Sequence, residues 1–67
     1  MEKYKSNLIN DADIFIKIGK RWIDEKRIEI IEIKHLPSGL VYSSEDKSQV
    51  KAYNQALKEL EKMFKSS

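Results

Sequence analysis

The sequence contains no cysteine, one proline, two glycines, one tryptophan and one histidine among its 67 residues. Without cysteine the chain forms neither a disulfide nor a thiolate metal site, and a single histidine leaves the usual zinc ligand sets incomplete. A domain of this length buries only about 60% of the surface that its unfolded chain exposes. We therefore expect a marginal core that depends on strongly apolar elements, here nine isoleucines, or on self-association.

The sequence also lacks a long hydrophobic run. No stretch approaches the ~20 apolar residues that a membrane span needs, and no apolar run of signal-peptide length follows the first five residues. Thirteen basic and eleven acidic side chains leave a formal net charge of +2, so charge alone does not indicate a nucleic-acid partner. We expect a soluble cytoplasmic protein that makes no membrane contact.

Residues suited to catalysis or cofactor binding are scarce. His35 lies near Ser38, but neither a cysteine nucleophile nor a Gly-x-Ser-x-Gly turn accompanies them. An exposed histidine at a strand end, followed by a turn serine, is the simpler interpretation. Gly19 and Gly39 stand in no phosphate-binding motif, and no acidic group has the spacing of a calcium loop. We expect no enzymatic activity, cofactor, metal or small-molecule substrate.

A helical pattern occupies the C-terminal third of the chain. Large apolar residues recur there at steps of three and four, which places them on one face of an α-helix. These residues are Val50, Tyr53, Leu57, Leu60 and Phe64. Glu45 and Asp46 suit the positive end of the helix dipole, and a preceding serine can cap the first amides. We predict a helix from about Ser44 to Lys65, whose apolar face requires a surface to cover.

The residues before this helix predict antiparallel strands. Isoleucine at every second position from residue 14 gives the period-two pattern of a half-buried strand. Gly19-Lys20 permits a tight turn, after which Arg21–Ile23 can return as a short strand. The charged run Asp24–Arg27 then predicts a second turn.

The segment from Arg27 to His35 is the strongest strand signal, because β-branched residues dominate it. Leu36–Gly39 predicts a turn that leads into a last short strand over residues 40–42. We expect residues 1–11 to form a flexible arm and residues 12–67 a single domain. The predicted fold class is α+β, with an antiparallel sheet of three to four strands packed on one C-terminal helix (βββα).

The apolar alternation slips in the middle of the second strand. Ile28 and Ile30 share one face, whereas Ile31 and Ile33 share the other. Because one helix covers only one face of a small sheet, either a bulge between Ile30 and Ile31 restores the phase, or both faces carry isoleucine. In the second case the uncovered face, with Phe15 beside Ile31 and Ile33, would be an apolar patch of the kind that marks an interface.

These observations lead to the hypothesis of a non-catalytic protein-binding module that acts through a sheet face or an edge strand and forms a homodimer. Tryptophan is common at interface hot spots, so Trp22 joins the expected contacts. The expected partner-binding residues are Phe15, Trp22, Ile31 and Ile33. Lysine outnumbers arginine and isoleucine outnumbers leucine, as in AT-rich genomes. Small chains of this style are often regulators or inhibitors encoded by phages or mobile elements.

The alternative hypothesis is a sheet-based DNA- or RNA-binding domain that uses basic side chains around Trp22. The basic residues concerned are Lys17, Lys20, Arg21, Lys26, Arg27 and Lys34. The segment from Gly39 to Leu60, with Ala52–Leu57 inside the predicted helix, resembles the end of the small sheet-plus-helix DNA-binding domains of phage integrases. The resemblance covers about a third of the chain. Acidic residues interrupt the positive charge of the strands, in contrast to that pattern: Asp24, Glu25, Glu29 and Glu32.

Overall fold

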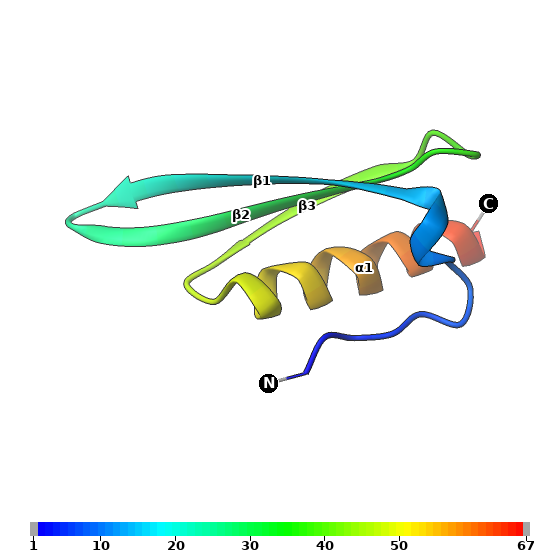
Figure 1. Ribbon diagram of the computed structural model, residues 1–67, viewed down its shortest axis with the longest axis horizontal. Coiled ribbons are helices and arrows are strands. Elements are labelled where there is room, and N and C mark those ends of the chain that lie inside the picture. Colours follow the sequence, from blue (N-terminus) through cyan, green and yellow to red (C-terminus); the bar gives the residue numbers. More distant parts are fainter. Residues whose placement is uncertain (1, 67) are drawn as a thin grey trace.

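The computed structural model describes residues 2–66, so the first residue of the predicted arm and the last residue of the predicted domain lie outside the described residues. The elements follow in the order η1 (Asp11–Asp13), β1 (Ile14–Ile23), β2 (Lys26–His35), β3 (Val41–Asp46) and α1 (Gln49–Ser66). The strands form an antiparallel sheet in the order β1-β2-β3, and α1 lies along one face of it (Figure 1). This arrangement confirms the predicted βββα fold.

The pairing between β1 and β2 runs without interruption from Ile14–His35 to Ile23–Lys26, so this ladder contains no bulge. Paired residues of an antiparallel ladder project to the same side of the sheet. We call the side covered by α1 the helix face and the other side the open face. Ile31 and Ile33 lie on the helix face and are 1% and 0% exposed. The second strand therefore has isoleucine on both faces.

The predicted composition of the uncovered face is wrong in two positions. Ile31 and Ile33 are core residues, because the unbroken register points them at α1. Phe15 pairs with Lys34 and shares the open face with Ile30 instead. The phase slip in the sequence reflects isoleucine on both faces, and which half of the strand faces the helix depends on where α1 packs.

The hydrophobic core lies between α1 and the strands β2 and β3. Its buried residues include the predicted helix positions Tyr53, Leu57 and Leu60, and the partly buried Met63 and Phe64 pack against it. Within residues 2–66 the buried hydrophobic residues are Ile9, Ile31, Ile33, Ala52, Tyr53, Ala56, Leu57 and Leu60. The apolar periodicity of the helix therefore identified the surface that packs on the sheet.

The helix begins later than predicted. Residues 43–46 continue β3, and Ser44 pairs with Ile31 and is only 7% exposed. The ladder therefore outweighs the capping signal in this segment. The start of α1 is organised by Ser48, whose hydroxyl oxygen accepts a hydrogen bond from the amide of Lys51. The carboxylate of Asp46 in turn accepts from the amide of Ser48.

The strand β1 runs straight through Gly19, so the turn predicted at Gly19-Lys20 and the separate strand after it are wrong. The chain reverses at Asp24 and Glu25, which both have positive φ angles of 47° and 67°. This is the conformation of the two-residue hairpin loop that matches strand twist. Because β3 pairs with β2 only from Glu29 onwards, the end of the β1–β2 hairpin protrudes beyond the rest of the sheet and beyond α1 (Figure 1).

This loop carries backbone strain, since residues with a Cβ atom disfavour positive φ. Replacing Asp24 with Asn and Glu25 with Gly is expected to raise the free energy of unfolding by about 1 kcal/mol, because Asn-Gly suits this loop best. Urea unfolding measures the change. The control is Glu25→Gln, which removes the charge but keeps the Cβ atom. An equal gain in the control would show that charge, and not backbone conformation, is responsible.

Candidate interaction surface on the protruding hairpin

The protruding hairpin exposes large apolar side chains. Trp22 is 68% exposed and Ile18 is 56% exposed, both on the helix face of β1, and Ile23 is 45% exposed on the open face. We call these three residues the hairpin cluster. Trp22 and Ile18 are largely uncovered because α1 begins at Gln49 and packs mainly on β2 and β3, whereas Ile23 is exposed because it lies on the open face. The chain therefore offers no apolar cover of its own for the far half of β1.

A groove lies between β1 and the first turns of α1. It encloses about 230 Å³ and is lined by Ile16 and Ile18 from β1, with Val50 and Tyr53 from the helix. Lys3 of the N-terminal segment also borders it, and its ammonium lies 4.5 Å from the centre of the Tyr53 ring. Trp22 lies beyond the groove on the same face of the strand as Ile16 and Ile18.

An ion pair between the two outer strands covers part of the open face. The guanidinium of Arg21 on β1 forms an ion pair with Glu45 on β3, and since β2 lies between these strands, the pair must reach across the open face of β2. Ile28 and Ile30, which project there, are half-buried. Phe15 is 60% exposed at the other end of the face. The open face is therefore a mixture of apolar and charged side chains.

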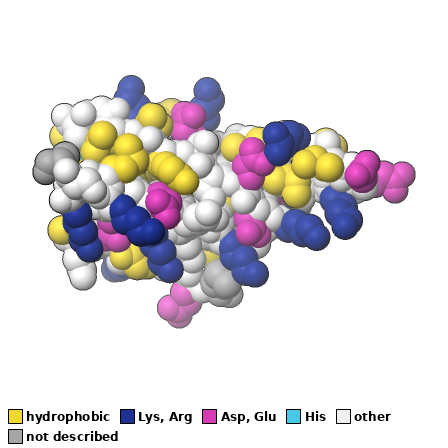
Figure 2. Space-filling view, turned by 180° about the vertical axis from the view of Figure 1, so that it is seen from behind, with side chains coloured by type: hydrophobic (Ala, Val, Ile, Leu, Met, Phe, Trp, Pro, Cys, Tyr) yellow, Lys and Arg dark blue, Asp and Glu magenta, His cyan; other side chains and the backbone are white. Residues whose placement is uncertain are grey.

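The six basic residues predicted to bind nucleic acid do not share one surface. Lys20 and Arg27 lie on the helix face, and the other four lie on the open face. Arg27 Nε is 3.2 Å from Glu29 Oε1, and Glu29 is itself 6% exposed. Figure 2 shows hydrophobic, basic and acidic side chains mixed along the narrow half of the molecule, with acidic side chains at its far end. The predicted basic residues thus form no continuous positive surface.

The structure separates the four predicted partner-binding residues. Trp22 and Phe15 are exposed but lie on opposite faces of β1, whereas Ile31 and Ile33 are in the core. Sequence reasoning missed the groove residues Ile18, Val50 and Tyr53. The signal was present in the alternating isoleucines of β1, which the sequence alone could not distinguish from residues covered by the helix.

His35 is buried, which corrects the prediction of an exposed strand-end histidine. It is 6% exposed, its ring packs edge to face on Phe64 with the centroids 4.7 Å apart, and Nδ1 lies 2.7 Å from the Ser38 hydroxyl oxygen. The Ser38 oxygen also accepts a hydrogen bond from the amide of Leu40. The His35–Ser38 contact therefore stabilises the turn between β2 and β3 and ties it to the end of α1.

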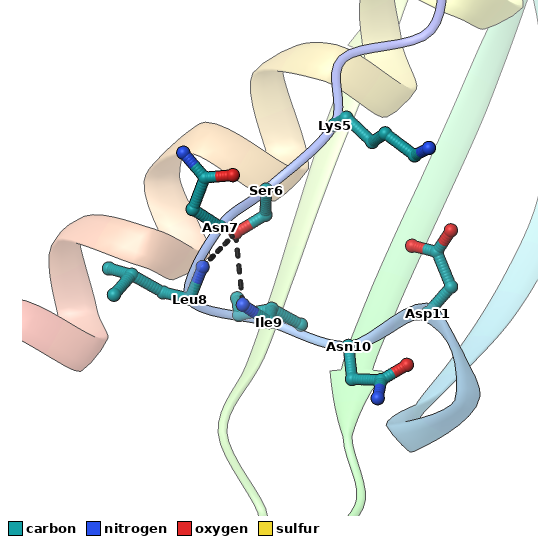
Figure 3. A pocket seen from close by; sticks show the side chains of 7 residues that line it. All are labelled: Lys5, Ser6, Asn7, Leu8, Ile9, Asn10 and Asp11. Carbon is teal, nitrogen blue, oxygen red and sulfur yellow. Dashed lines mark hydrogen bonds between the residues drawn. The ribbon is translucent and has the colours of Figure 1, made fainter.

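The N-terminal segment runs alongside α1 (Figure 1) and is anchored to it partly through a buried carboxylate. The hydroxyls of Tyr4 and Ser6 each donate a hydrogen bond to Glu61, which is 9% exposed. The Ser6 oxygen accepts from the amides of Leu8 and Ile9 (Figure 3). We call the Tyr4, Ser6 and Glu61 contacts the arm clasp. It fixes the segment that places Ile9, 3% exposed, in the core; the flexibility predicted for the arm stays a prediction.

The arm clasp shifts the protonation equilibria of its members. Burial acts to raise the pKa of Glu61, but the hydrogen bonds from Ser6 and Tyr4, with the nearby Lys65 and Lys58 ammonium groups, outweigh it and hold the pKa below its ordinary value. The hydrogen bond to this carboxylate is the main reason that the pKa of Tyr4 is raised. The clasp is therefore most stable with Glu61 ionised and Tyr4 protonated.

Over residues 2–66, no group of three or more acidic or histidine side chains is placed to hold a metal ion. The described part of the chain also has no helix with the length and apolarity needed to cross a membrane. Comparison of the chain with models of protein families, with curated proteins and with solved structures finds no match.

Proposed function

We propose that this chain is a small, non-catalytic protein-binding module that regulates or inhibits its partner and contacts it with the protruding hairpin. The observation that supports this proposal is the hairpin cluster, in which Trp22 is 68% exposed on an element that extends away from the core. Burying apolar surface contributes about 25 cal/mol per Å², and tryptophan is enriched among the residues that dominate binding energy. The cluster is suited to insertion into an apolar pocket of a partner.

A protein partner fits the charges of the hairpin better than a nucleic acid does. The first residues to meet a target are Asp24 and Glu25 in the loop, and these carboxylates would repel phosphates. Arg21 and Arg27 are already paired with Glu45 and Glu29. The two arginines of the hairpin are thus already neutralised within the chain, beside its exposed apolar side chains.

Selection from a displayed random-peptide library tests the proposal. Peptides that bind the wild-type chain are expected to bind Trp22→Ala at least about tenfold more weakly, because the variant removes the largest exposed apolar side chain. Binding is also expected to shift the emission of Trp22, the only tryptophan, to shorter wavelength. The matched control is Phe15→Ala, which removes an aromatic side chain of similar exposure from the opposite face of the same strand.

Two results would contradict this assignment. Loss of binding in Phe15→Ala alone would assign the contact to the open face. Binding of oligonucleotides whose affinity falls steeply between two salt concentrations, with no peptide selected, would establish the nucleic-acid alternative. The homodimer stays a prediction in this proposal, and sedimentation equilibrium of the wild-type chain and of Trp22→Ala decides whether the partner on the hairpin is a second copy.

A further inference from the structure

The strand β1 has a free backbone edge. Residues that bond to the neighbouring strand alternate with residues whose N–H and C=O point away from it. Because Leu36 donates to the carbonyl of Asp13 (2.8 Å), the odd-numbered residues of β1 bond to β2 and the even-numbered ones face the edge. The amide of Ile14 donates a hydrogen bond to the carbonyl oxygen of Asp11. The remaining edge residues, which make no other backbone hydrogen bond among residues 2–66, are Ile16, Ile18, Lys20 and Trp22.

Two residues of the free edge of β1 also line the groove. Ile16 and Ile18 offer backbone groups at the edge, and their side chains line the groove opposite Val50 and Tyr53. An extended segment placed along β1 would continue the sheet, and every second side chain would point to the helix face. Those side chains would enter the groove, while the alternate ones would lie on the open face beside Lys17 and Arg21.

The positive charge of β1 indicates that a segment bound beside it would carry acidic side chains. The strand carries Lys17, Lys20 and Arg21 and no acidic residue, and Lys3 lies beside the groove. Only Arg21 of these four forms an ion pair within residues 2–66. Pairing of β1 with β1 of a second copy would place these cations against each other, which is unfavourable across a ladder. An acidic segment would instead place its alternate carboxylates beside the unpaired Lys17 on the open face, while Lys20 and Lys3 on the helix side add to the positive charge around the strand.

We propose that β1 accepts an extended acidic segment of a partner protein as a fourth strand, with apolar side chains at every second position seated in the groove between β1 and α1. This inference rests on the proposed protein-binding function and specifies the chemistry of its partner. Backbone hydrogen bonds to the free edge supply general affinity for a strand. The groove and the lysines select alternating apolar and acidic residues.

The probe is a short peptide with blocked ends in which valine and glutamate alternate, titrated against the full chain while Trp22 emission and backbone amide signals are followed. We expect binding that shifts the amides of Ile16, Ile18, Lys20 and Trp22. Ile18→Asp is expected to weaken it at least about tenfold. Val41→Asp introduces the same charge at an apolar position, 45% exposed, on the opposite edge strand and is expected to leave affinity unchanged.

Two N-methylated peptides test strand addition itself, because methylation removes backbone donors. Methylating one alternate set of residues is expected to abolish binding, and methylating the other set to preserve it, since only one set faces β1. Equal binding of both methylated peptides, or of a valine–lysine peptide, would overturn the inference. Library peptides that depend on Trp22 but tolerate methylation of both sets would overturn strand addition while leaving the protein-binding function intact. Concentration-dependent dimers abolished by Ile18→Asp would assign the edge to a second copy.

Discussion

Replacing Ile31 with alanine is expected to lower the free energy of unfolding by about 3–4 kcal/mol. Ile31 is 1% exposed and lies in the centre of the sheet, between Ile18 on β1 and Ser44 on β3. The substitution removes buried methyl and methylene groups and leaves a cavity that the surrounding strands cannot close. A chain of this length has roughly 3–10 kcal/mol of stability in total, so the substitution is expected to remove a third of that stability or more.

The neighbouring Ile30→Ala variant is the matched control, because it makes the same chemical change one position away on the same strand. Ile30 is half-buried on the open face, opposite Gly19 and Glu45. Its loss is expected to cost about 1 kcal/mol, since the removed atoms leave a surface depression and not a closed cavity. Urea unfolding of the two variants measures the difference. Equal losses would mean that the faces of β2 are not distinguished by α1.

Replacing Glu61 with glutamine is expected to lower the free energy of unfolding by about 2 kcal/mol at neutral pH. The hydroxyls of Tyr4 and Ser6 donate to different oxygens of the carboxylate, and the amide keeps only one of these oxygens, so one hydroxyl loses its acceptor in place. Hydrogen bonds to a charged group are also the stronger ones. The matched control is Glu59→Gln on the same helix. Glu59 forms only an exposed pair with Lys62, so its loss is expected to cost less than about 0.5 kcal/mol.

The arm clasp also predicts a dependence on pH. A carboxyl whose pKa is lowered by folding contributes stability above its unfolded pKa, and loses that contribution as pH falls through the lower folded value. The contribution is therefore complete at neutral pH and disappears in acid. The raised pKa of Tyr4 gives the opposite limit, with loss in strong alkali as pH rises through the raised value.

The amide signals of Leu8 and Ile9, which bond to the Ser6 oxygen, follow this change in an NMR titration. In the wild-type chain they are expected to move on acidification, whereas Glu61→Gln should already show the shifted positions at neutral pH. Signals in the variant that match those of the wild-type chain at every pH would show that Glu61 does not hold the arm.

The clasp and the proposed strand site are connected through the N-terminal segment. Lys3 borders the groove, and the next residue, Tyr4, is held both by Glu61 and by Asn54, whose side-chain oxygen accepts from the Tyr4 amide at 2.6 Å. The groove between β1 and α1 is thus bordered by a segment that the clasp anchors. Measuring peptide affinity in Glu61→Gln would show how far this anchorage shapes the proposed site.

Periodicity in the sequence was sufficient for the fold class. The repeat at steps of three and four predicted the apolar face of α1, and the buried Tyr53, Leu57 and Leu60 confirm it. The β-branched segment and the Leu36–Gly39 turn placed β2 and the start of β3 correctly. These signals are local, because each depends only on the geometry of one element, and local geometry can be derived from neighbouring residues.

Local signals were misleading wherever a distant contact competed with them. Gly19 suggested a turn, yet its position opposite Ile30 in a continuous ladder keeps it in β1. Ser44 suggested a helix cap, yet its pairing with Ile31 extends β3. Glu61 stands outside the apolar stripe of the helix, yet the arm buries it. In each case the partner is far away in the sequence, so nothing near the residue indicates it.

The sequence by itself therefore determined that this chain is a βββα domain whose second strand has a slip in its apolar alternation. The unbroken ladder between β1 and β2 then showed that isoleucine lies on both faces of that strand. Only the tertiary structure decided which isoleucines are core, since that depends on the side of the sheet on which α1 packs. The same choice leaves the hairpin end of the helix face of β1 uncovered, which exposes Trp22 and Ile18 and creates the groove. The proposed interaction surface exists because a single helix is too narrow to cover three strands, and its position follows from the packing of that helix on β2 and β3.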